Sequence, residues 1–430
     1  MKVSFYNIGC KLNFAEMSQM QKEFEDAGFE VVDFKEQSDI VLINTCTVTH
    51  HADADSRKYI RRAIRNNPDA FIGVMGCYSQ LKPDEIVEID GVDAVLGTNN
   101  KFDIRELIRK FEKKNKPEIF IPDLNEVSFH FASSADNENR TRMVLKIQDG
   151  CDYVCTYCAV PYARGGSRSM DFDELKQKLI DLNNTDYHEI ILSGINLGEY
   201  KAPTGENFTN VIRFMAETDL NYRVRISSIE PNLITDELIR IVKTADNICR
   251  HFHVPLQSGS TEILKLMKRR YKVETFENLV IKIKAEIPDC CIGVDVIEGF
   301  PGETDEHFKE TYNLLDSLPI SYLHVFTYSE RDITPASKYP NQVQPGIRKE
   351  RTKRLRKLSD KMKKEFIQSQ TGKTGIVIPE DEKLENGKII MEGWTGNYIR
   401  VRFETANLSH LPTRVKITGY DNGIAIAEII

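Results

Sequence analysis

Three cysteines stand close together in the middle of the chain, in the run GCDYVCTYC, at Cys151, Cys155 and Cys158. Thiolates at this spacing can hold three corners of a 4Fe–4S cluster, whose usual complement is four cysteines, and leave one iron open for a substrate or cofactor. A structural zinc site is the alternative, but it needs a fourth ligand, and the usual CxxC pair spacing is only half present. The run therefore favours an iron–sulfur centre with an open position.

Three further cysteines, Cys10, Cys46 and Cys77, lie far apart in the sequence but share a structural position. Each follows an apolar run that predicts a parallel strand, so all three should project from the carboxyl edge of one sheet, where ligand sites form. A second three-cysteine cluster is the interpretation, and three unrelated core cysteines are the alternative. The remaining cysteines share no spacing and are expected to be buried as small hydrophobes: Cys249, Cys290 and Cys291.

The segments around these cysteines predict an α/β protein of several domains. Residues 1–112 alternate apolar runs (3–8, 40–44, 71–75 and 92–96) with helical patterns, as in a parallel α/β sheet. Residues 113–136 are polar and weakly periodic, which predicts a linker with one short strand. Residues 137–368 contain six strand-like runs separated by helical segments, which predicts a partial (β/α)6 barrel with an open side.

The end of the chain predicts a basic helix followed by a small barrel. Residues 346–368 are rich in Lys and Arg, so this helix either touches phosphates or forms a solvated face. In residues 369–430 short strand-like runs alternate with Gly and Asn turns, as in a small antiparallel barrel. Aromatic and basic side chains suited to RNA stacking and phosphate contact are interleaved there, although a purely structural role is the alternative: Trp394, Tyr398, Arg400 and Arg402.

The composition argues against a membrane protein, a secreted protein and a wholly basic nucleic-acid binder. No stretch approaches the roughly 20 consecutive apolar residues of a membrane span, and the start lacks the features of a secretory signal, so a cytoplasmic protein without a membrane partner is expected. The net charge of −7 argues against a wholly basic nucleic-acid binder but allows local basic patches. An odd count of nine cysteines fits disulfide pairing poorly, which favours metal or redox chemistry.

Residues 140–330 resemble the radical S-adenosylmethionine superfamily, because the CxxxCxxC run carries an aromatic residue before its last cysteine. The resemblance implies that S-adenosylmethionine binds the open iron and is cleaved to methionine and a 5′-deoxyadenosyl radical. It also implies contacts to the cofactor or substrate from Tyr157 and from positions after the later strands, namely Ser193, Gly194, Asn196, Ser228, Glu230, His253, Gln257, Gly299 and Phe300.

The whole chain resembles the methylthiotransferases, and more narrowly their threonylcarbamoyladenosine tRNA branch. The motifs that support this are NTCTVTHHADADSR, QDGCDYVCTYCAVPYARGGSRS, LSGINLGEY, HFHVPLQSGS, MKRRY, DVIEGFPGET and YSERDITPA. The resemblance implies an N-terminal cluster domain, a radical S-adenosylmethionine barrel and a C-terminal RNA-binding barrel called TRAM. Small changes in GCKLNFAEM and DVIEGFPGE put neighbouring contacts in doubt but no cysteine.

The implied reaction adds a methylthio group to C2 of an already modified adenosine beside the anticodon. Two S-adenosylmethionine molecules would be consumed: one methylates a sulfur held on the Cys10, Cys46 and Cys77 cluster, and the other yields the radical at the second cluster. The C2 hydrogen is neither acidic nor polarised, so a radical route fits and acid–base catalysis does not. The resemblance further implies tRNA, a sulfur source and an electron donor such as a flavodoxin or ferredoxin as partners. The sequence has no obvious long apolar interface, which favours a monomer.

Basic stretches outside the barrel are candidates for phosphate contact. In RKYIRRAIR the side chains of Arg57, Arg61, Arg62 and Arg65 share one or two helix faces, and KLMKRRY is a second such stretch. A solvated charged helix is the alternative.

Three other functions stay open at this point. The substrate of the same reaction could be isopentenyladenosine in tRNA or an aspartate of a ribosomal protein. A protein of another class, a non-catalytic RNA-binding iron–sulfur protein, would use its clusters as structural staples. The two open-iron sets argue against it, because a staple normally fills every coordination position.

Overall fold

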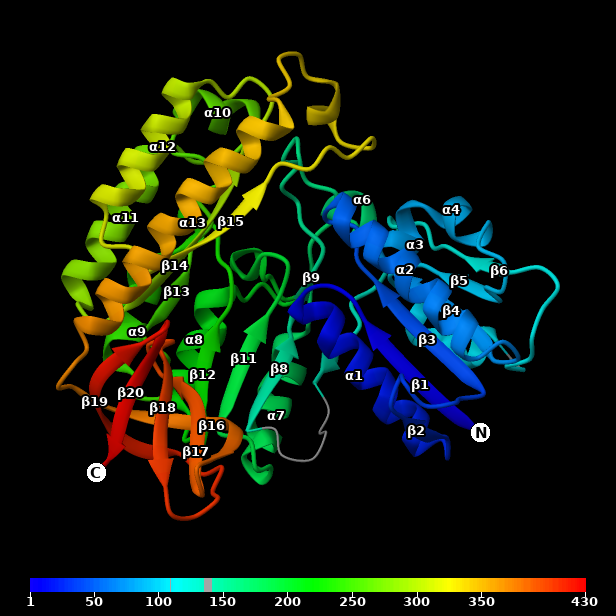
Figure 1. Cartoon of the computed structure of the whole chain (residues 1–430), viewed down its shortest axis with the longest axis horizontal. Coiled ribbons are helices and arrows are strands. Elements are labelled where there is room, and N and C mark those ends of the chain that lie inside the picture. Colours follow the sequence, from blue (N-terminus) through cyan, green and yellow to red (C-terminus); the bar gives the residue numbers. More distant parts are fainter. Residues whose placement is uncertain (109, 135–140) are drawn as a thin grey trace.

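In the computed structural model the N-terminal domain is a parallel six-stranded sheet with helices on both faces (Figure 1). The strand order is β2-β1-β3-β4-β5-β6, and every neighbouring pair runs parallel. The strands are β1 Lys2–Asn7, β2 Glu30–Val32, β3 Ile40–Thr45, β4 Phe71–Gly76, β5 Ala94–Leu96 and β6 Glu118–Phe120. The expected apolar runs correspond to β1, β3, β4 and β5, and β2 and β6 extend the sheet at its edges.

The strands of this sheet are buried on both faces, which is why they are continuous apolar runs. Along β3, Ile40 and Leu42 belong to the core under α1, whereas Val41 and Ile43 belong to the core under α2. The helices are α1 Lys11–Asp26, α2 His50–Asn66, α3 Cys77–Leu81, α4 Pro83–Val87 and α5 Ile104–Leu107. Helices on both faces leave the carboxyl edge of the sheet free for a site.

Residues 113–136, expected to be a linker, contain strands of both neighbouring sheets. β6 pairs with β5 at the edge of the N-terminal sheet, and β7 (Ala132–Ser133) pairs antiparallel with the first central strand, β8 (Arg142–Lys146). The structure describes residues 1–108, 110–134 and 141–430, so the expected boundary between 136 and 137 lies outside the described residues. The segment is joined by backbone hydrogen bonds to both domains, because its short strands complete sheet edges.

The central domain contains six parallel strands, the number expected for a partial barrel. They are β8, β11 Glu189–Ser193, β12 Arg223–Ile226, β13 His251–His253, β14 Cys291–Glu298 and β15 Tyr322–Thr327. They form two sheets, β12-β11-β8-β7 and β13-β14-β15, and parallel bridges from Val224 to Ile248 and from Ser228 to His253 connect them. The strands therefore form an open arc rather than a closed barrel.

Helices cover the outer side of this arc, and Figure 1 shows α11, α12 and α13 along it. The helices are α6 Val160–Arg164, α7 Phe172–Asp181, α8 Phe208–Glu217, α9 Asp236–Thr244, α10 Thr261–Leu266, α11 Val273–Glu286 and α12 Asp305–Ser317. A short antiparallel pair, β9 (Gln148–Asp149) and β10 (Arg168–Ser169), follows β8. Outward-facing residues such as Val224 and Phe252 form the large apolar core under these helices.

The inner side of the arc is polar, because successive side chains of a strand point to opposite faces. Alternate positions of β12 to β15 supply the residues of an interior that we call the bore: Arg225, His251, His253, Asp295 and His324. On the open side, Phe14 and Ala15 of α1 pack against Val144 and Ile191 of β8 and β11. The N-terminal domain thus covers part of the mouth of the bore.

The expected basic helix is α13 (Pro345–Gln368), and its inner face is not solvated. Leu355 and Leu358 are buried in the central core, and the guanidinium groups of Arg348 and Arg351 are buried against carboxylates of the central domain. Neither phosphate contact nor solvation therefore applies to this face, whereas the opposite face, with exposed side chains such as Lys353 and Lys357, is solvated as one interpretation expected. Among the described residues, no helix combines the length and apolar character that crossing a membrane requires.

The C-terminal domain is a closed barrel in the order β16-β17-β18-β20-β19. Its strands are β16 Thr374–Glu385, β17 Lys388–Thr395, β18 Arg400–Thr405, β19 Thr413–Asp421 and β20 Ile424–Ile429. The pair β18–β20 is parallel, and the others are antiparallel, which departs from the expected all-antiparallel barrel. Val377, Met391 and Val401 lie in its core.

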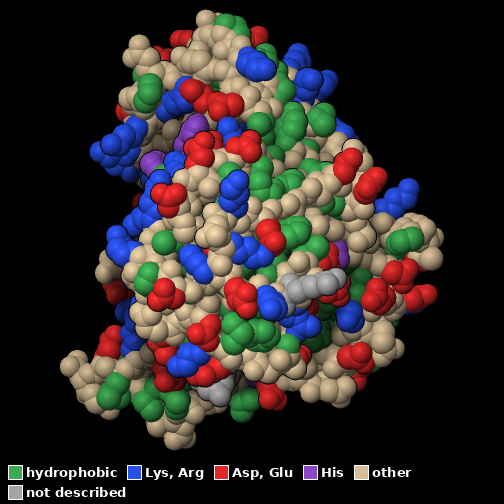
Figure 2. All heavy atoms as spheres, turned by 90° about the vertical axis from the view of Figure 1, so that its right-hand side faces the viewer, with side chains coloured by type: hydrophobic (Ala, Val, Ile, Leu, Met, Phe, Trp, Pro, Cys, Tyr) green, Lys and Arg blue, Asp and Glu red, His purple; other side chains and the backbone are tan. Residues whose placement is uncertain are grey.

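This barrel sits against the amino ends of the central strands. Arg142 at the start of β8 forms two hydrogen bonds of 2.6 and 2.7 Å to the Glu380 carboxylate, and Arg225 donates to the carbonyl oxygen of Thr395 at 2.9 Å. The base of the bore is therefore closed by the C-terminal domain. Figure 2 looks onto the side of the N-terminal domain, where basic and acidic side chains are interspersed.

Candidate active site

The N-terminal cysteines meet at the carboxyl edge of the sheet. Cys10 caps α1 after β1, Cys46 directly follows β3, and Cys77 opens α3 after β4, and these three strands are neighbours. Gly9 has a φ of +128°, and a Cβ placed there would lie 3.1 Å from the Cys46 Cβ and 2.5 Å from Asn13 Nδ2. Glycine at this position lets the loop that carries Cys10 approach the loop that carries Cys46.

The thiols of this first set influence one another's charge. Burial, followed by the nearby Cys77, raises the pKa of Cys46 to about 12, and Cys10 adds to the effect. Burial also raises the pKa of Cys77, and the positive charges of Arg164 and Lys101 oppose it. Three thiols in such proximity need a cationic centre to exist together as thiolates, which an iron–sulfur cluster supplies.

The second set, Cys151, Cys155 and Cys158, lies in one loop at the carboxyl side of the central strands. The loop follows β8 after the short strand β9. The Cys151 sulfur accepts a hydrogen bond of 3.4 Å from the Tyr153 backbone N–H. Burial, followed by the neighbouring Cys155, raises the pKa of Cys158 to about 12. The set has the same donor chemistry as the first.

Arg269 links this loop to the residues that follow β12. Its Nη1 donates to the Cys155 sulfur at 3.0 Å, and its guanidinium forms an ion pair with Glu230, which follows β12. The side chain is 3% exposed. The stretch KLMKRRY was expected to contact RNA, and that expectation is wrong for Arg269 because its charge is directed at a cysteine sulfur.

Segments that carry cysteines of both sets line a shared cavity of about 170 Å³. Val48 and Thr49, from the loop after Cys46, line one side of it, and Tyr157 and Cys158 line another. The remaining wall comes from the ends of central strands, including Gln257, Asp295 and Phe326. The loop after Cys46 and the loop of Cys158, which belong to different domains, therefore border one space.

A buried charge network holds the two domains in this arrangement. Glu16 of α1 accepts from Lys101 at 2.5 Å, from Lys146 of β8 at 2.8 Å and from Arg164 of α6 at 2.9 Å. Burial disfavours the charged form of Glu16, but Arg164, Lys101 and Lys146 outweigh it and hold the pKa of this carboxyl well below its usual value. Asp149 shares Lys146 and Arg164, so three cations and two anions form one buried, paired set.

A second contact fixes the loop of Cys46 against the central domain. Arg331, which follows β15, forms an ion pair of 2.7 Å with Asp53 of α2 and donates to the Thr47 hydroxyl. Thr47 is the residue after Cys46 and also donates to Asp53 at 2.7 Å. The position of the first cysteine set therefore depends on a side chain of the other domain.

Comparison with known proteins gives this geometry a family. A family described as "Uncharacterized protein family UPF0004" matches residues 2–97, and the radical SAM superfamily matches residues 145–315. A threonylcarbamoyladenosine tRNA methylthiotransferase, MtaB, of Bacillus subtilis is 40% identical over 96% of this chain and 93% of its own length. A tRNA-2-methylthio-N(6)-dimethylallyladenosine synthase of Acetivibrio thermocellus is 32% identical over 92% of this chain and 84% of its own.

The chain belongs to the radical S-adenosylmethionine methylthiotransferases. Its cofactors are accordingly S-adenosylmethionine and 4Fe–4S clusters. The fold agrees with that of a solved radical S-adenosylmethionine methyltransferase, TsrM of Kitasatospora setae, with a TM-score of 0.58 and 17% identity over 78% of this chain and 77% of that one.

Several residues expected to contact the cofactor in this methylthiotransferase lie at the carboxyl edge of the central arc, the edge that carries the second cysteine set. Ser193 ends β11 and is buried, and Gly194 approaches Gln148 so closely that a Cβ would lie 2.7 Å from its Oε1. Asn196 is 4% exposed, and neither polar atom of its side chain has a partner among the described residues. A buried amide without partners costs free energy, so Asn196 is available to a ligand.

The expected residues at the ends of the later strands lie either in the bore and the shared cavity or beside the cysteine loop. Ser228 and His253 form a backbone bridge, and His253 Nε2 lies 2.7 Å from Asp295 Oδ1 inside the bore. Gln257 has a φ of +67° and lines the shared cavity, and a non-glycine residue held in this strained conformation is typical of ligand sites. Glu230 is already paired with Arg269. Its place is therefore beside the cysteine loop.

Two expected contact residues are structural instead. Phe300 is fully buried with Ile263 and Met267, and its ring meets that of Tyr157 edge-on at 6.5 Å. Gly299 lies against α13, where a Cβ would be 2.2 Å from Arg348 Cγ. Phe300 therefore packs behind Tyr157 and Gly299 packs against α13, and neither lines the shared cavity.

The aromatic residues expected to stack on RNA are engaged with the central domain. Tyr398, at a φ of +59°, stacks on Trp394 at 4.6 Å, and its ring lies 4.5 Å from that of His251 and 5.0 Å from the Arg225 guanidinium. Arg142 covers the other ring, that of Trp394, at 5.4 Å. These aromatics form the floor of the bore, which corrects their assignment as an exposed RNA-stacking surface.

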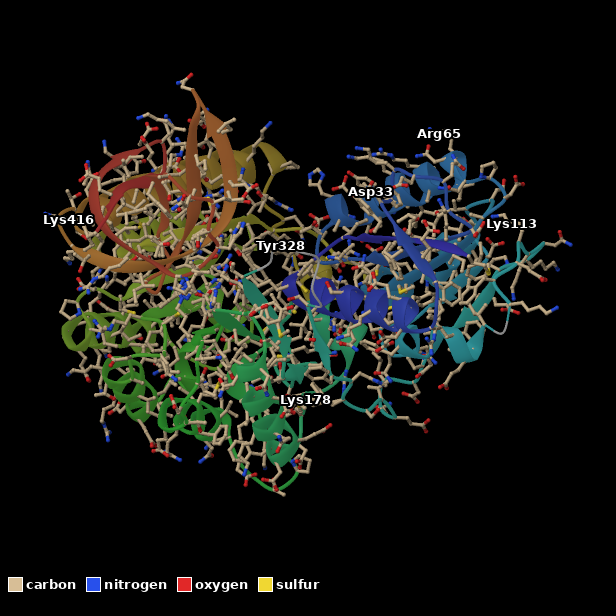
Figure 3. The ribbon with its side chains drawn as sticks, turned by 90° about the horizontal axis from the view of Figure 1, so that it is seen from below. Asp33, Arg65, Lys113, Lys178, Tyr328 and Lys416 are labelled. Atoms are coloured by element: carbon tan, nitrogen blue, oxygen red, sulfur yellow. The ribbon has the colours of Figure 1, made fainter. Side chains whose placement is uncertain are left out.

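The basic side chains expected to contact RNA differ in whether their charges are already paired within the protein. Arg400 and Arg402 both bind the buried carboxylate of Glu392, at 2.6 and 2.7 Å. Arg57 donates to the Tyr78 hydroxyl at 2.8 Å and contacts Glu85. The remaining three lie further along α2: Arg61 and Arg65 are exposed, and Arg62 lies over the Phe34 ring. In Figure 3, Arg65 stands at the outer edge of the N-terminal domain, away from Tyr328 at the shared cavity.

Sequence patterns did not identify several residues of the site. Arg269 and Glu199, which lies beside Cys151, touch the second cysteine loop, and Asp295 and His324 line the bore. Alternating apolar and polar positions in IGVDVIEGF and YLHVFTYS are the signal that could have found the last two, because polar residues inside a buried strand must face a polar space.

Proposed function

We propose that this protein adds a methylthio group to C2 of N6-threonylcarbamoyladenosine beside the anticodon of tRNA. The observation that supports the reaction best is that the loop after Cys46 in one domain and Cys158 in the other line one cavity. The relative at 40% identity supports the choice of substrate, because its name specifies threonylcarbamoyladenosine. A reaction on tRNA also places the protein in the cytoplasm.

We assign one 4Fe–4S cluster to Cys10, Cys46 and Cys77 and the other to Cys151, Cys155 and Cys158. Bound S-adenosylmethionine and these clusters supply the radical chemistry and the methylthio group, which the side chains cannot provide. The protein's own part is to bind, orient and exclude water. The buried position of Cys77 and Cys155, at 8% and 5% exposure, keeps water from the cluster ligands.

Around the second set, the protein's groups fit the two ends of S-adenosylmethionine. The free amide of Asn196 and the edge of β11 are suited to the amino-acid portion of the cofactor, and the ring of Tyr157 is packed from behind by Phe300. The N–H of Arg269 directed at the Cys155 sulfur stabilises negative charge on that ligand. Each of these contacts orients a group that has to stand in the shared cavity.

The polar bore fits the modified base. The adenine has to be turned out of the anticodon loop to reach a recessed cavity, and such splayed bases are what RNA-binding proteins recognise by hydrogen bonds and stacking. His253, Asp295 and His324 offer hydrogen-bonding atoms within 4.8 Å of one another. His253 and Asp295 already bond to each other, so a polar substituent would use the remaining hydrogen-bonding capacity of this group, and an apolar one would not.

We propose three functional domains with the boundaries 1–112, 137–368 and 369–430, and we identify the last with a TRAM domain. The closed barrel of five strands supports this identification. Because Trp394 and Tyr398 are turned inward, contact with tRNA is expected from exposed charges such as those of Arg61 and Arg65. An electron donor and a sulfur source are further partners that the reaction requires.

The test of the proposal is nucleoside mass spectrometry of total tRNA from cells with and without the gene. Loss of 2-methylthio-N6-threonylcarbamoyladenosine, with its precursor retained, is the expected result. Loss of the 2-methylthio form of dimethylallyladenosine instead would transfer the assignment to the substrate named for the Acetivibrio relative. An unchanged tRNA profile would overturn the tRNA assignment. Complementation with a Cys77→Ala variant should fail, whereas Cys290→Ala, in the apolar core, should restore the nucleoside.

A further inference from the structure

Lys11 is the first residue of α1 and directly follows Cys10. The helix lies across the open side of the central arc, because Phe14 and Ala15 one turn later pack against Val144 and Ile191 on the inner face of β8 and β11. This packing directs the start of α1 toward the bore. The positive charge of Lys11 acts on His251 and His324, two residues of the bore. Lys11 thus stands at the wall of the substrate space.

Lys11 differs from the other cations of this domain contact because it has no counter-ion among the described residues. Lys101, Lys146 and Arg164 all pair with Glu16. Among the residues that the structure describes, no hydrogen bond or ion pair is formed by the Lys11 ammonium group, although the side chain is exposed to the space around it. The carboxylates nearest the bore are already occupied: Glu189 by Arg223 and Arg225, and Asp295 by His253.

The bore therefore contains an ammonium group that has no bonded counter-ion among the described residues. Arg142 and Arg225 stand at its base, and their partners are the carboxylates of Glu380 and Glu189. Lys11 adds a further cation to this wall without adding an anion. A site of this kind favours a ligand that brings its own negative charge, because a charge-assisted hydrogen bond in a recessed site is stronger than one in water.

We infer that Lys11 pairs with the carboxylate of the N6-threonylcarbamoyl group and so determines which modified adenosine is accepted. This inference rests on the proposed function. The chemistry of the base supports the position: C2 and the carbon bearing N6 both flank N1 of the ring, so a substituent on N6 lies near the carbon that reacts. Lys11 is adjacent to Cys10, a proposed ligand of the cluster that serves C2. A dimethylallyl substituent has no charge to offer and would leave Lys11 unpaired.

A phosphate of the tRNA backbone is the other anion that could reach Lys11, and the experiment separates the two. Two anticodon stem-loop RNAs of identical sequence are compared, one with threonylcarbamoyladenosine and one with plain adenosine beside the anticodon. Their binding to protein reconstituted with both clusters is measured by fluorescence anisotropy. Wild-type protein should prefer the modified hairpin by about tenfold or more, as one charge-assisted hydrogen bond provides.

The variant Lys11→Gln should lose this preference while its iron and sulfide content and its affinity for the plain hairpin stay at the wild-type level. Lys11→Arg should retain most of the preference because it keeps the charge. Lys22→Gln, on the exposed surface of the same helix, is the matched control and should behave as wild type.

Two results would overturn the inference. An unchanged preference in fully loaded Lys11→Gln means that another group reads the carboxylate. An equal loss of affinity for both hairpins assigns Lys11 to a backbone phosphate. Failure of the proposed function is a separate result, because wild-type protein would then neither prefer nor modify the threonylcarbamoyladenosine hairpin.

Discussion

The two cysteine sets are built in opposite ways. Cys151, Cys155 and Cys158 lie in one loop, so their proximity follows from the sequence itself. Cys10, Cys46 and Cys77 are brought together by three adjacent parallel strands, and their proximity exists only when the sheet has formed. A local set can bind iron in a partly folded chain, whereas a distributed set depends on the fold of its domain and on the contacts that hold it.

The largest expected effect separates the chemistry of the two sets. Cys46→Ala should abolish methylthio transfer but leave cleavage of S-adenosylmethionine to 5′-deoxyadenosine, because the loop of the second set is unchanged. Cys155→Ala should abolish both. Chromatographic quantification of 5′-deoxyadenosine and of the modified nucleoside in the same reaction measures the two effects. Loss of cleavage in Cys46→Ala, with the second cluster still loaded, would contradict the division of roles.

The dependence of the first set on domain contacts is tested by Glu16→Gln. Removing this charge leaves Lys101, Lys146 and Arg164 buried without their shared partner, which should cost about 3–5 kcal/mol of stability. Denaturant unfolding followed by circular dichroism measures the loss. Glu25→Gln, exposed on the same helix, is the control and should unfold like wild type. A wild-type midpoint for Glu16→Gln would show that the network contributes nothing to docking.

The role of Arg269 at the second set is tested by Arg269→Lys. Lysine keeps the positive charge but loses the planar guanidinium group that binds both the Cys155 sulfur and Glu230. We expect cleavage of S-adenosylmethionine to fall by roughly 10- to 100-fold, as for other contacts behind a metal ligand. The reduction potential of this cluster, read by titration with electron paramagnetic resonance, should become more negative. Lys265→Ala, exposed on α10, should change neither value. An unaltered potential in Arg269→Lys would remove Arg269 from the site.

The smallest expected effect concerns the backbone that brings the first set together. Gly9→Ala places a Cβ at a φ of +128° and 2.5 Å from Asn13 Nδ2, so we expect a loss of about 1–3 kcal/mol and weaker iron binding by this set alone. Gly205→Ala has a φ of +108° in open space, so it carries the backbone strain without the contact. Iron content per chain and thermal unfolding compare the two. Equal iron loading in both variants would show that the close approach at Gly9 is dispensable.

The sequence was sufficient where a signal is local or periodic. Apolar runs predicted β1, β3, β4 and β5 because strands buried on both faces leave no room for polar residues, and the positions of Cys10, Cys46 and Cys77 after such runs placed them at one edge. The separation of Cys151, Cys155 and Cys158 needed no fold at all.

The sequence was insufficient where a side chain meets a partner from another domain. Trp394 and Tyr398 have the composition of an RNA-stacking surface, but whether a ring faces outward depends on what packs against it, here His251 and Arg225. Arg269 in KLMKRRY likewise resembles a surface cation, and only the approach of Cys155 gives it another role. Such contacts join residues more than a hundred positions apart, so no local pattern encodes them.

Helix α1 has Cys10 at its tip and Glu16 in its second turn. A helix rises about 1.5 Å per residue, so the distance along its axis between the cysteine and the domain anchor is set at about 9 Å. The number of residues in this stretch of the helix therefore sets the spacing between the two cysteine sets. Lengthening this stretch by a single residue would both shift Cys10 outward and turn it about 100° around the axis. An insertion therefore tests the spacing as directly as a substitution tests a side chain.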